Sequence, residues 1–424
     1  MNGRDAEIPP PKLISTLRRH NLLPAIVFLP TRRKCDEAAQ AVGADRSQPY
    51  DAQRADGRKT VFEEFAREHP EIIDHKHAKM IVVSGVAAHH AGHIPSWKLL
   101  VERMMASGLL NAIFATSTVA AGVDFPARTV VISNADTRGN DGWRPLSASE
   151  LQQMTGRAGR RGRDNVGFVV LVPGPFQNPR KIAELLSSKP DPLESKFRAT
   201  YTSLLNLLDA FGSFDHVREI AEKSYAFRGM AGNAAMSHRL WEPFERRARV
   251  LDHFGYLNFE SEVVTEDGKW LADLRIDRPL HVGEALRDGI FDELQPKELA
   301  AVMASVASDA DRSYGELRSS RRVINLLDDL EQTVMTVSNV ERKHGVEAVE
   351  ELNYSAAAAA ERWTAGMEWD ELVSRSTAEP GDLVRLLSRT GEALRQVASL
   401  SASNSAVAAL ARATSATILR DPIR

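Results

Sequence analysis

The chain has 424 residues, of which 43% are apolar and 26% charged, and its formal net charge is −3. At about 100–200 residues per domain, this length predicts two to four domains, each with its own hydrophobic core. No run of 18 apolar residues occurs, which argues against a membrane span. Cys35 is the single cysteine, so the chain can form neither an internal disulfide nor a thiolate zinc site. The N-terminus lacks the apolar core of a signal peptide, and we expect a cytoplasmic protein.

Short apolar runs in the first 175 residues predict buried strands. They are four or five residues long and rich in Val, Ile and Phe, which is typical of strands buried on both faces of a parallel sheet. The runs are Ala25–Leu29, Met80–Val83, Ala112–Ala115, Thr129–Ile132 and Phe168–Val172.

Helices are expected between these strands. One covers 96–107, with Ser96 as its N-cap and Gly108 just past its end. Another covers 149–161, where Ser147 and Glu150 have the spacing of a capping box. The alternation of strands and helices predicts an α/β domain over residues 1–175, with a parallel sheet and flanking helices.

The remainder is predicted to be mostly α-helical. Leucines and valines follow a helical period over 383–397, and the alanines 356–360 read as helix interior. A β-like patch over 256–276, with Asp267-Gly268 as a hairpin turn, suggests a winged-helix-like segment. We therefore expect a linker and winged-helix-like domain at 176–280 and a C-terminal helical domain at 281–424.

The strongest chemical signal is the segment 153–162, QMTGRAGRRG. Arg157 and Arg160 are three residues apart with small residues between them, which on a helix places both on one face. A guanidinium is permanently charged and offers a planar fork of donors, so two of them suit a phosphate chain. Taken alone, the segment is equally compatible with a solvated basic helix end.

Further motifs indicate a family. The segments 116–124 and 153–160 resemble motifs five and six of superfamily-two helicases, and 25–35 resembles motif four. The run His89-His90-Ala91-Gly92, followed by Pro95, is similar to the superkiller-type (Ski-like) DExH-box RNA helicases and their archaeal DNA-helicase relatives. The segments 191–208 and 381–390 resemble the linker and the C-terminal helical domain of the same group.

This resemblance implies a second RecA-like domain at 1–175 and a role for individual residues. Arg157 and Arg160 would be arginine fingers, and Gln153 would lie beside the nucleotide phosphates. The resemblance also implies nucleotide contacts at Asp124, Gly122 and Gly156, and nucleic-acid contacts at Thr116, Thr118, Arg32, His90 and Gly92. The family's strand-separating hairpin would lie in 136–146, with residues 139–142 at its tip.

A helicase motor also needs a phosphate loop, G-x-x-x-x-G-K-[ST], and a magnesium-binding acidic motif, and neither occurs here. We therefore expect the first RecA-like domain to be absent from this chain, so that it holds half of the site for ATP with Mg. That domain would be a partner, together with single-stranded RNA or DNA. The isolated chain is expected to lack ATPase activity. One alternative is a stand-alone nucleic-acid-binding or regulatory module, and another is half of a related DNA helicase.

The sequence argues against a metal site. Six of the twelve histidines fall within 69–93, and His89 and His93 have the spacing of ligands on a helix. Gly92 and Pro95 disfavour a helix there, and no cysteine or carboxylate pair completes the set. Asp36-Glu37 superficially resembles an acidic helicase motif, but we expect these residues to be solvated acids on a helix face.

Overall fold

The computed structural model describes residues 7–47, 49–117, 125–139, 142–195, 198–225, 234–309, 312–400 and 404–423. The chain divides into two compact units, Met1–Pro192 and Leu193–Arg424. Among the described residues no helix combines the length and the apolar character that crossing a membrane would require. The domain limits predicted at 175 and 280 stay predictions.

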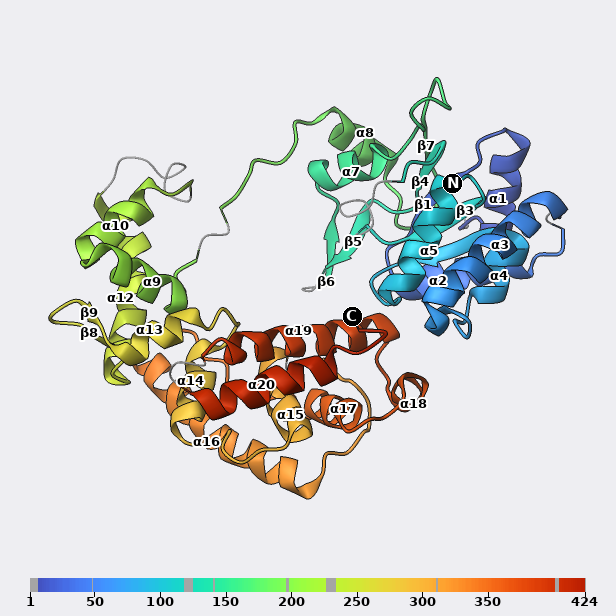
Figure 1. Cartoon of the computed structure of the whole chain (residues 1–424). Helices are drawn as coiled ribbons and strands as arrows, with labels where there is room; N and C mark the ends of the chain where they lie inside the picture. Colours follow the sequence, from blue (N-terminus) through green and yellow to red (C-terminus); the bar gives the residue numbers. More distant parts are fainter. Residues whose placement is uncertain are drawn as a thin grey trace. The chain divides into compact units, whose positions relative to one another are not determined.

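The first unit is built on a parallel five-stranded sheet in the order β2-β3-β1-β4-β7 (Figure 1). Neighbouring strands are in register, so that Phe28 pairs with Ala115 and Ile132, and His89 pairs with Ala115. A separate antiparallel hairpin is formed by β5 and β6. The strands of this unit are β1 (Ala25–Phe28), β2 (Val86–His89), β3 (Ala112–Ala115), β4 (Thr129–Ile132), β5 (Asp136–Gly139), β6 (Gly142–Pro145) and β7 (Phe168–Leu171).

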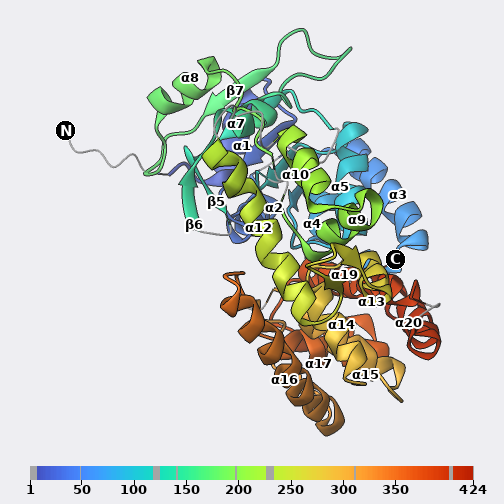
Figure 2. The ribbon, with the colours of Figure 1, turned by 90° about the vertical axis from the view of Figure 1, so that its left-hand side faces the viewer.

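Helices flank this sheet, as predicted. Leu13, Ile14 and Leu17 of α1 and Cys35 of α2 pack against strand residues such as Phe114 in one buried cluster. Helix α8 lies beside α7 in both views (Figures 1 and 2). The helices are α1 (Pro10–Arg19), α2 (Arg32–Ala44), α3 (Ala52–Glu68), the 3-10 turn η1 (Pro70–Ile72), α4 (Ala78–Ser84), α5 (Pro95–Ala106), α7 (Ala148–Thr155) and α8 (Pro179–Ser187).

One of the predicted strands is wrong. The run Met80–Val83 lies inside α4, and the strand begins only at Val86. Gly85 separates the two elements because it adopts φ +64°, a left-handed conformation that ends the helix. A four-residue apolar run carries no period by which helix and strand can be told apart. The other four runs are strands. Two of them have the predicted range, and the other two end one residue earlier than predicted.

The predicted helix ends are partly corrected. Helix α5 begins at Pro95, with Ile94 rather than Ser96 as its N-cap, while Gly108 follows its end with φ +75° as expected. The capping box of Ser147 and Glu150 is confirmed at α7. This helix ends at Thr155, however, and not at 161. Residues 156–164 therefore form a loop, and the prediction that Arg157 and Arg160 share a helix face is wrong.

The second unit is helical, with α15 at its centre. Helix α15 contacts α16, α17, α19 and α20, and α19 lies along α20 (Figure 1). The elements are α9 (Tyr201–Phe211), α10 (Phe214–Lys223), α12 (Ala234–His253), β8 (Leu257–Asn258), β9 (Val263–Val264), α13 (Glu266–Asp273), α14 (Pro279–Arg287), α15 (Pro296–Ala307), α16 (Arg321–Lys343), α17 (Tyr354–Thr364), α18 (Trp369–Arg375), α19 (Pro380–Ala398) and α20 (Ser405–Ile418).

Small side chains explain how closely two of these helices approach. The five alanines 356–360 of α17 are fully buried, and α17 packs against α15. The prediction that they are helix interior is confirmed. Trp363 of the same helix is 1% exposed and meets Trp369 edge to face at 5.9 Å between ring centroids, so it is a core residue.

The β-like patch is smaller than predicted. Strands β8 and β9 have two residues each, and Glu262, with φ +56°, lies in the turn between them. Asp267 and Gly268 belong to α13, whose N-cap Thr265 accepts a hydrogen bond from the Gly268 N–H at 3.1 Å. The predicted hairpin turn at Asp267-Gly268 is therefore wrong, and the winged-helix-like segment stays a prediction.

Burial of His281 predicts a pH dependence of stability. The side chain lies in α14, is 4% exposed and has no hydrogen bond at Nε2 within the described residues. Burial, with the nearby charge of Arg278, lowers the pKa of His281 to about 4. Because the unfolded ring binds its proton near pH 6.5, stability is lost as the pH falls from about 6.5 to about 4.

We expect the wild-type chain to lose about 2 kcal/mol more stability between pH 7 and pH 5 than the variant His281→Leu. Urea unfolding of both proteins at the two pH values measures this difference. An equal loss in both proteins would show that the ring is not held neutral by burial.

Candidate nucleotide and nucleic-acid site

The residues predicted to contact nucleic acid gather at one edge of the sheet. Arg32 follows the end of β1, His90 and Gly92 follow β2, and Thr116 follows β3. These three strands are neighbours in register, and strands lie about 4.7–4.9 Å apart. The carboxyl edge of the sheet thus brings together residues that are up to 84 positions apart in the sequence.

Within this edge the side chains differ in their access to solvent. Arg32 and Thr116 are partly exposed, whereas Gly92 is buried and His90 is only 1% exposed. The His90 ring turns inward, where Nε2 lies 3.2 Å from Oδ1 of Asp36. The predicted contact of His90 with nucleic acid stays a prediction. Because the side chain is buried, the loop would contact a nucleic-acid strand through its backbone.

A buried cluster of histidines surrounds Asp36 of α2. Nε2 of His77 lies 2.8 Å from Oδ1, and Nε2 of His93 lies 3.4 Å from the same oxygen. The ammonium of Lys76 donates to the other oxygen, Oδ2, at 2.7 Å. The expectation of a solvated acid at Asp36 is therefore wrong, because the fold brings three histidines to it from 41, 54 and 57 residues along the chain.

Burial and hydrogen bonding set the protonation of this cluster. Burial lowers the pKa of His93 to about 3 and that of His75 to about 2. Burial by itself would raise the pKa of Asp36, but the donors around it, His77 foremost, hold it well below its usual range. Near pH 7 a carboxylate therefore faces neutral rings at His75 and His93. Asp36, His90 and His93 are also close enough to offer ligand atoms to one metal ion.

The hairpin β5–β6 is the segment in which a strand separator was predicted. The described residues form an antiparallel pair from Asp136 with Pro145 to Gly139 with Gly142, while 140 and 141 lie outside the described residues. The hairpin contacts the Thr116 segment, since the hydroxyl groups of Ser117 and Thr137 are 3.2 Å apart.

Helix α7 holds the hairpin at its base. Arg144 of β6 donates from both terminal nitrogens to Glu150 of α7, at 2.5 and 2.7 Å. Glu150 also accepts from the Ser147 N–H as part of the capping box. Its hydrogen bond from Arg144 lowers the pKa of Glu150 below its usual range.

The predicted arginine fingers lie at the opposite edge of the sheet. The loop 156–164 leads from α7 into the start of β7, and it contacts the segment that leads into β4. The Ala127 N–H donates to the carbonyl of Arg157 at 3.0 Å, and the Gly159 N–H donates to the carbonyl of Ala127 at 2.7 Å. Arg157 is therefore fixed through its backbone, while its side chain is partly exposed.

Arg160 is fixed through its side chain. Its Nε and Nη2 donate to the two carboxylate oxygens of Asp164 at 2.7 and 3.0 Å, and its own N–H donates to Oδ2 at 3.0 Å. Arg128 donates to Oδ1 at 2.8 Å. The hydrogen bonds from Arg160 hold the pKa of Asp164 well below its usual range. Asp164 was missed in the sequence, although its spacing of four residues from Arg160 is a signal for such a pair.

Of the remaining predicted residues, some are exposed on the surface and the others lie outside the described residues. Gln153, in the last turn of α7, and Gly156, just after it, are exposed. Thr118, Gly122 and Asp124 lie outside the described residues.

One observation links the two edges. Residues 116–127 run from the carboxyl end of β3 to the amino end of β4. The segment that resembles motif five therefore begins beside the predicted nucleic-acid contacts, and Ala127, three residues past its end at 124, contacts the loop of Arg157.

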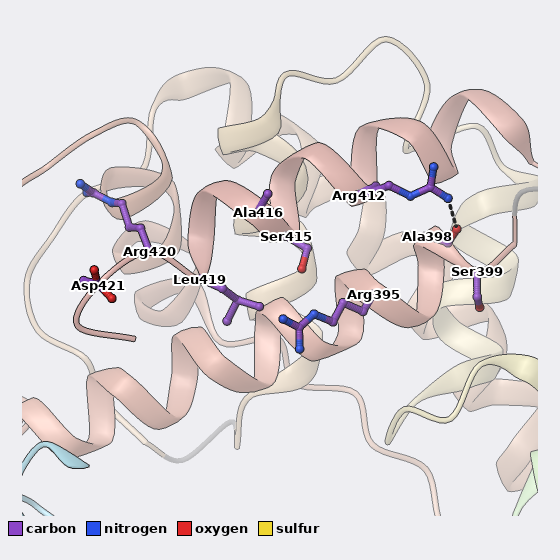
Figure 3. A pocket seen from close by; sticks show the side chains of 9 residues that line it. All are labelled: Arg395, Ala398, Ser399, Arg412, Ser415, Ala416, Leu419, Arg420 and Asp421. Carbon is purple, nitrogen blue, oxygen red and sulfur yellow. Dashed lines mark hydrogen bonds between the residues drawn. The ribbon is translucent and has the colours of Figure 1, made fainter. Parts of the chain in front are cut away.

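The second unit contains a cavity of about 770 Å³ between α19 and α20, lined by both polar and apolar side chains (Figure 3). Arg395 and Arg412 line it from the two helices, and Arg420 follows α20. Arg412 reaches the carbonyl of Ala398 at 3.5 Å, and Arg420 packs over the Trp363 ring at 3.6 Å. The figure shows Arg420 pointing away from Arg395, so the guanidinium groups do not converge on one ligand.

Comparison with known proteins places both units in context. Residues 261–424 match the DSHCT (NUC185) domain family. The chain is 35% identical over 227 residues to the DExH-box ATP-dependent RNA helicase DExH15, chloroplastic, of Arabidopsis thaliana, covering 49% of this chain and 19% of the relative. It is 35% identical over 231 residues to the probable helicase HelY of Mycobacterium tuberculosis (51% and 24%).

The antiviral helicase SKI2 of Saccharomyces cerevisiae is 33% identical over 208 residues, which is 47% of this chain and 16% of the relative. The matched region is therefore a quarter or less of the length of each of these relatives.

Proposed function

This chain belongs to the C-terminal part of the Ski2-like helicases, and we propose that it supplies the second RecA-like domain and the helical region of an ATP-dependent RNA helicase. The observation that supports this most is the division of the predicted residues between the two edges of the sheet. The residues predicted to contact nucleic acid lie at the carboxyl edge, and the predicted arginine fingers lie at the amino edge.

ATP with Mg is proposed to lie at the amino edge, between this chain and a first RecA-like domain. The loop fits phosphates chemically, because it carries Arg157, Arg160, Arg161 and Arg163 against the single acid Asp164. When bound, ATP supplies the γ-phosphoryl group that is transferred to water. Arg157 and Arg160 stabilise charge on that group, and the Mg ligands come from the first domain.

Arg157 and Arg160 are held in the loop by different contacts, and we propose that they have different roles in ATP hydrolysis. The backbone of Arg157 is held by Ala127 and its side chain is partly exposed, whereas the guanidinium of Arg160 is bound by the buried carboxylate of Asp164. Arg157 is then the residue that reaches the phosphate, while Arg160 holds the loop and adds charge to it. Without the first domain, we propose that the chain has no appreciable ATP turnover of its own.

Nucleic acid is proposed to bind along the carboxyl edge. Thr116 and the backbone of the 90–92 loop hold successive phosphates, and Arg32 adds a charged contact. RNA is proposed as the substrate because the Arabidopsis relative is named an RNA helicase. Closure of the ATP cleft is then proposed to move the bound strand by shifting the population between two states.

Binding of fluorescent single-stranded RNA across a salt series tests this proposal. We expect the binding constant to fall at least about tenfold between 50 and 200 mM salt, as three or more phosphate contacts require. Arg32→Ala should weaken binding and flatten this dependence. Arg19→Ala is the matched control, because Arg19 is exposed and ends α1, the helix that precedes the amino end of β1.

DNA of the same length and sequence serves as the competitor. Tighter binding of RNA than of DNA is expected. Equal or weaker binding of RNA would contradict the choice of substrate, and the absence of binding at low salt would contradict a nucleic-acid surface in this chain.

A further inference from the structure

The geometry around Asp36 points to a zinc site formed by Asp36, His90 and His93. Oδ1 of Asp36 and one ring nitrogen of each histidine all lie within 4.8 Å of one another. The three residues come from α2 and from the loop between β2 and α5, and all are buried. We infer that this cluster binds a divalent transition-metal ion, with Zn²⁺ as the ion that these nitrogen and oxygen ligands fit best.

The distances from Oδ1 fit ligands of one metal ion as well as long hydrogen bonds. The His90 and His93 rings, stacked at 3.9 Å between centroids, would separate to reach tetrahedral angles. Nε2 of His90 and of His93 lie 3.2 and 3.4 Å from Oδ1. A tetrahedral ion with bonds of about 2.0–2.1 Å separates its ligand atoms by about 3.3–3.4 Å, whereas N–H···O hydrogen bonds centre near about 2.9–3.0 Å. His77, at 2.8 Å from the same oxygen, has an ordinary hydrogen-bond distance.

His93 supplies an independent observation. Its side chain is 2% exposed, and Nε2 makes no hydrogen bond of acceptable geometry although it faces the carboxylate. A buried nitrogen without a partner costs free energy, which binding an ion would recover. The other ring nitrogen, Nδ1, lies 3.1 Å from Nε2 of His75. The His77 N–H donates to Nδ1 of His75 at 3.2 Å, so the ring proton of His75 lies on Nε2 and is donated to Nδ1 of His93. The His93 proton is then on Nε2. Coordination through that nitrogen moves this proton to Nδ1 of His93 and moves the His75 proton from Nε2 to Nδ1, which breaks the hydrogen bond from the His77 N–H.

The surrounding groups form an outer shell for this site. His77 donates to Oδ1, and Lys76 donates to Oδ2, so the carboxylate is oriented from both sides. His75 stacks on Trp97 of α5 at 3.6 Å between ring centroids, which fixes the ring that faces His93. A water molecule or His77 would complete a fourth position.

His90 has to change when the ion binds. Its Nδ1 accepts a hydrogen bond from the Gly92 N–H at 3.1 Å, which places the ring proton on Nε2. Coordination through Nε2 moves that proton to Nδ1 and breaks the bond to Gly92, with no net release of protons from the ring. The ion would thus join α2 to the 90–93 loop and alter the backbone that follows β2.

Metal analysis of protein purified without a histidine tag tests this inference. We expect about one Zn²⁺ per chain, and a rise of several degrees in Tm when Zn²⁺ is added to chelator-treated protein. His93→Leu and Asp36→Asn should lose the ion and the Tm response. His20→Gln, which changes an exposed histidine at the end of α1, should keep both.

Wild-type protein alone gives a second measurement should the variants fail to fold. Titration of chelator-treated wild type with Co²⁺ should give the visible absorption bands of a tetrahedral ion, and Zn²⁺ should displace them. Absence of both bound Zn²⁺ and a Zn²⁺-dependent Tm, with no such bands, would overturn the inference and leave a hydrogen-bonded polar cluster.

Discussion

We expect Arg157→Ala to lower RNA-stimulated ATP turnover by about 10³-fold or more when the chain acts together with a first RecA-like domain. The side chain is partly exposed, and the backbone of Arg157 is held by Ala127, so the hydrogen bonds that fix the loop remain when the side chain is truncated. A steady-state assay with saturating RNA measures the loss. The melting temperature should fall less than in Arg160→Ala.

Arg160→Ala should behave differently. Its guanidinium is bound by Asp164, whose side chain is 0% exposed, and Arg128 alone would then face that buried carboxylate. Leaving a buried carboxylate without one of its hydrogen-bond partners costs about 1–3 kcal/mol. This variant should therefore lose stability as well as ATP turnover. A drop in turnover without a drop in Tm would contradict the structural part that we assign to Arg160.

Arg161→Ala is the matched control for both variants. It removes the same charge from the same loop, and the residue is exposed. We expect turnover within about threefold of wild type, a change small beside the 10³-fold loss at Arg157. Steady ATP turnover by the isolated chain, abolished by Arg157→Ala, would contradict the proposal that a first domain is required.

The parts of the fold that could be predicted are those governed by local pattern. Strands such as Ala112–Ala115 are continuous apolar runs, and the capping box at Ser147 is a matter of spacing within four residues. The end of α7 was not predictable in this way. Just past its C-cap, Gly156, the backbone turns to Ala127: the Ala127 N–H donates to the carbonyl of Arg157, and the Gly159 N–H donates to the carbonyl of Ala127. These partners are distant in the sequence.

The environment of Asp36 could not be predicted for a similar reason. Its partners lie on segments that meet it only after the sheet has formed, because β2 places His90 beside the helix that follows β1. The spacing of His89 and His93 drew attention to these two residues, but the tertiary structure separates them: Nε2 of His89 lies 2.9 Å from Glu102, whereas His90 and His93 lie beside Asp36.

Candidate residues could be predicted where a motif is contiguous in the sequence. Their arrangement could not be predicted, because it depends on tertiary contacts. Arg157 and Thr116 are candidates because of their motifs, but neither motif predicts that the two residues lie at opposite edges of the sheet. That division follows from the strand order, since β3 ends where the segment of Thr116 begins and β7 starts where the arginine loop ends.

The second large effect is expected from Gly167→Ala, a substitution outside every motif. A Cβ at this position would lie 2.4 Å from the carbonyl oxygen of Ala158 and 2.7 Å from the nitrogen of Gly159. Both are backbone atoms, so no side chain can turn away. The loop cannot retreat freely either, because Gly159 and Arg157 are bonded to Ala127 on its other side.

The added methyl group must therefore displace the arginine loop. We expect a loss of about 1–3 kcal/mol in stability from overpacking, and a Tm lower by several degrees. A shift of about 1 Å in a positioning group can reduce turnover by about 10²-fold, so ATP turnover should fall although no functional side chain is changed. Gly174→Ala is the control, since a Cβ there meets nothing within 4 Å. Wild-type Tm and turnover in Gly167→Ala would show that the close contact between Gly167 and the loop does not position the arginines.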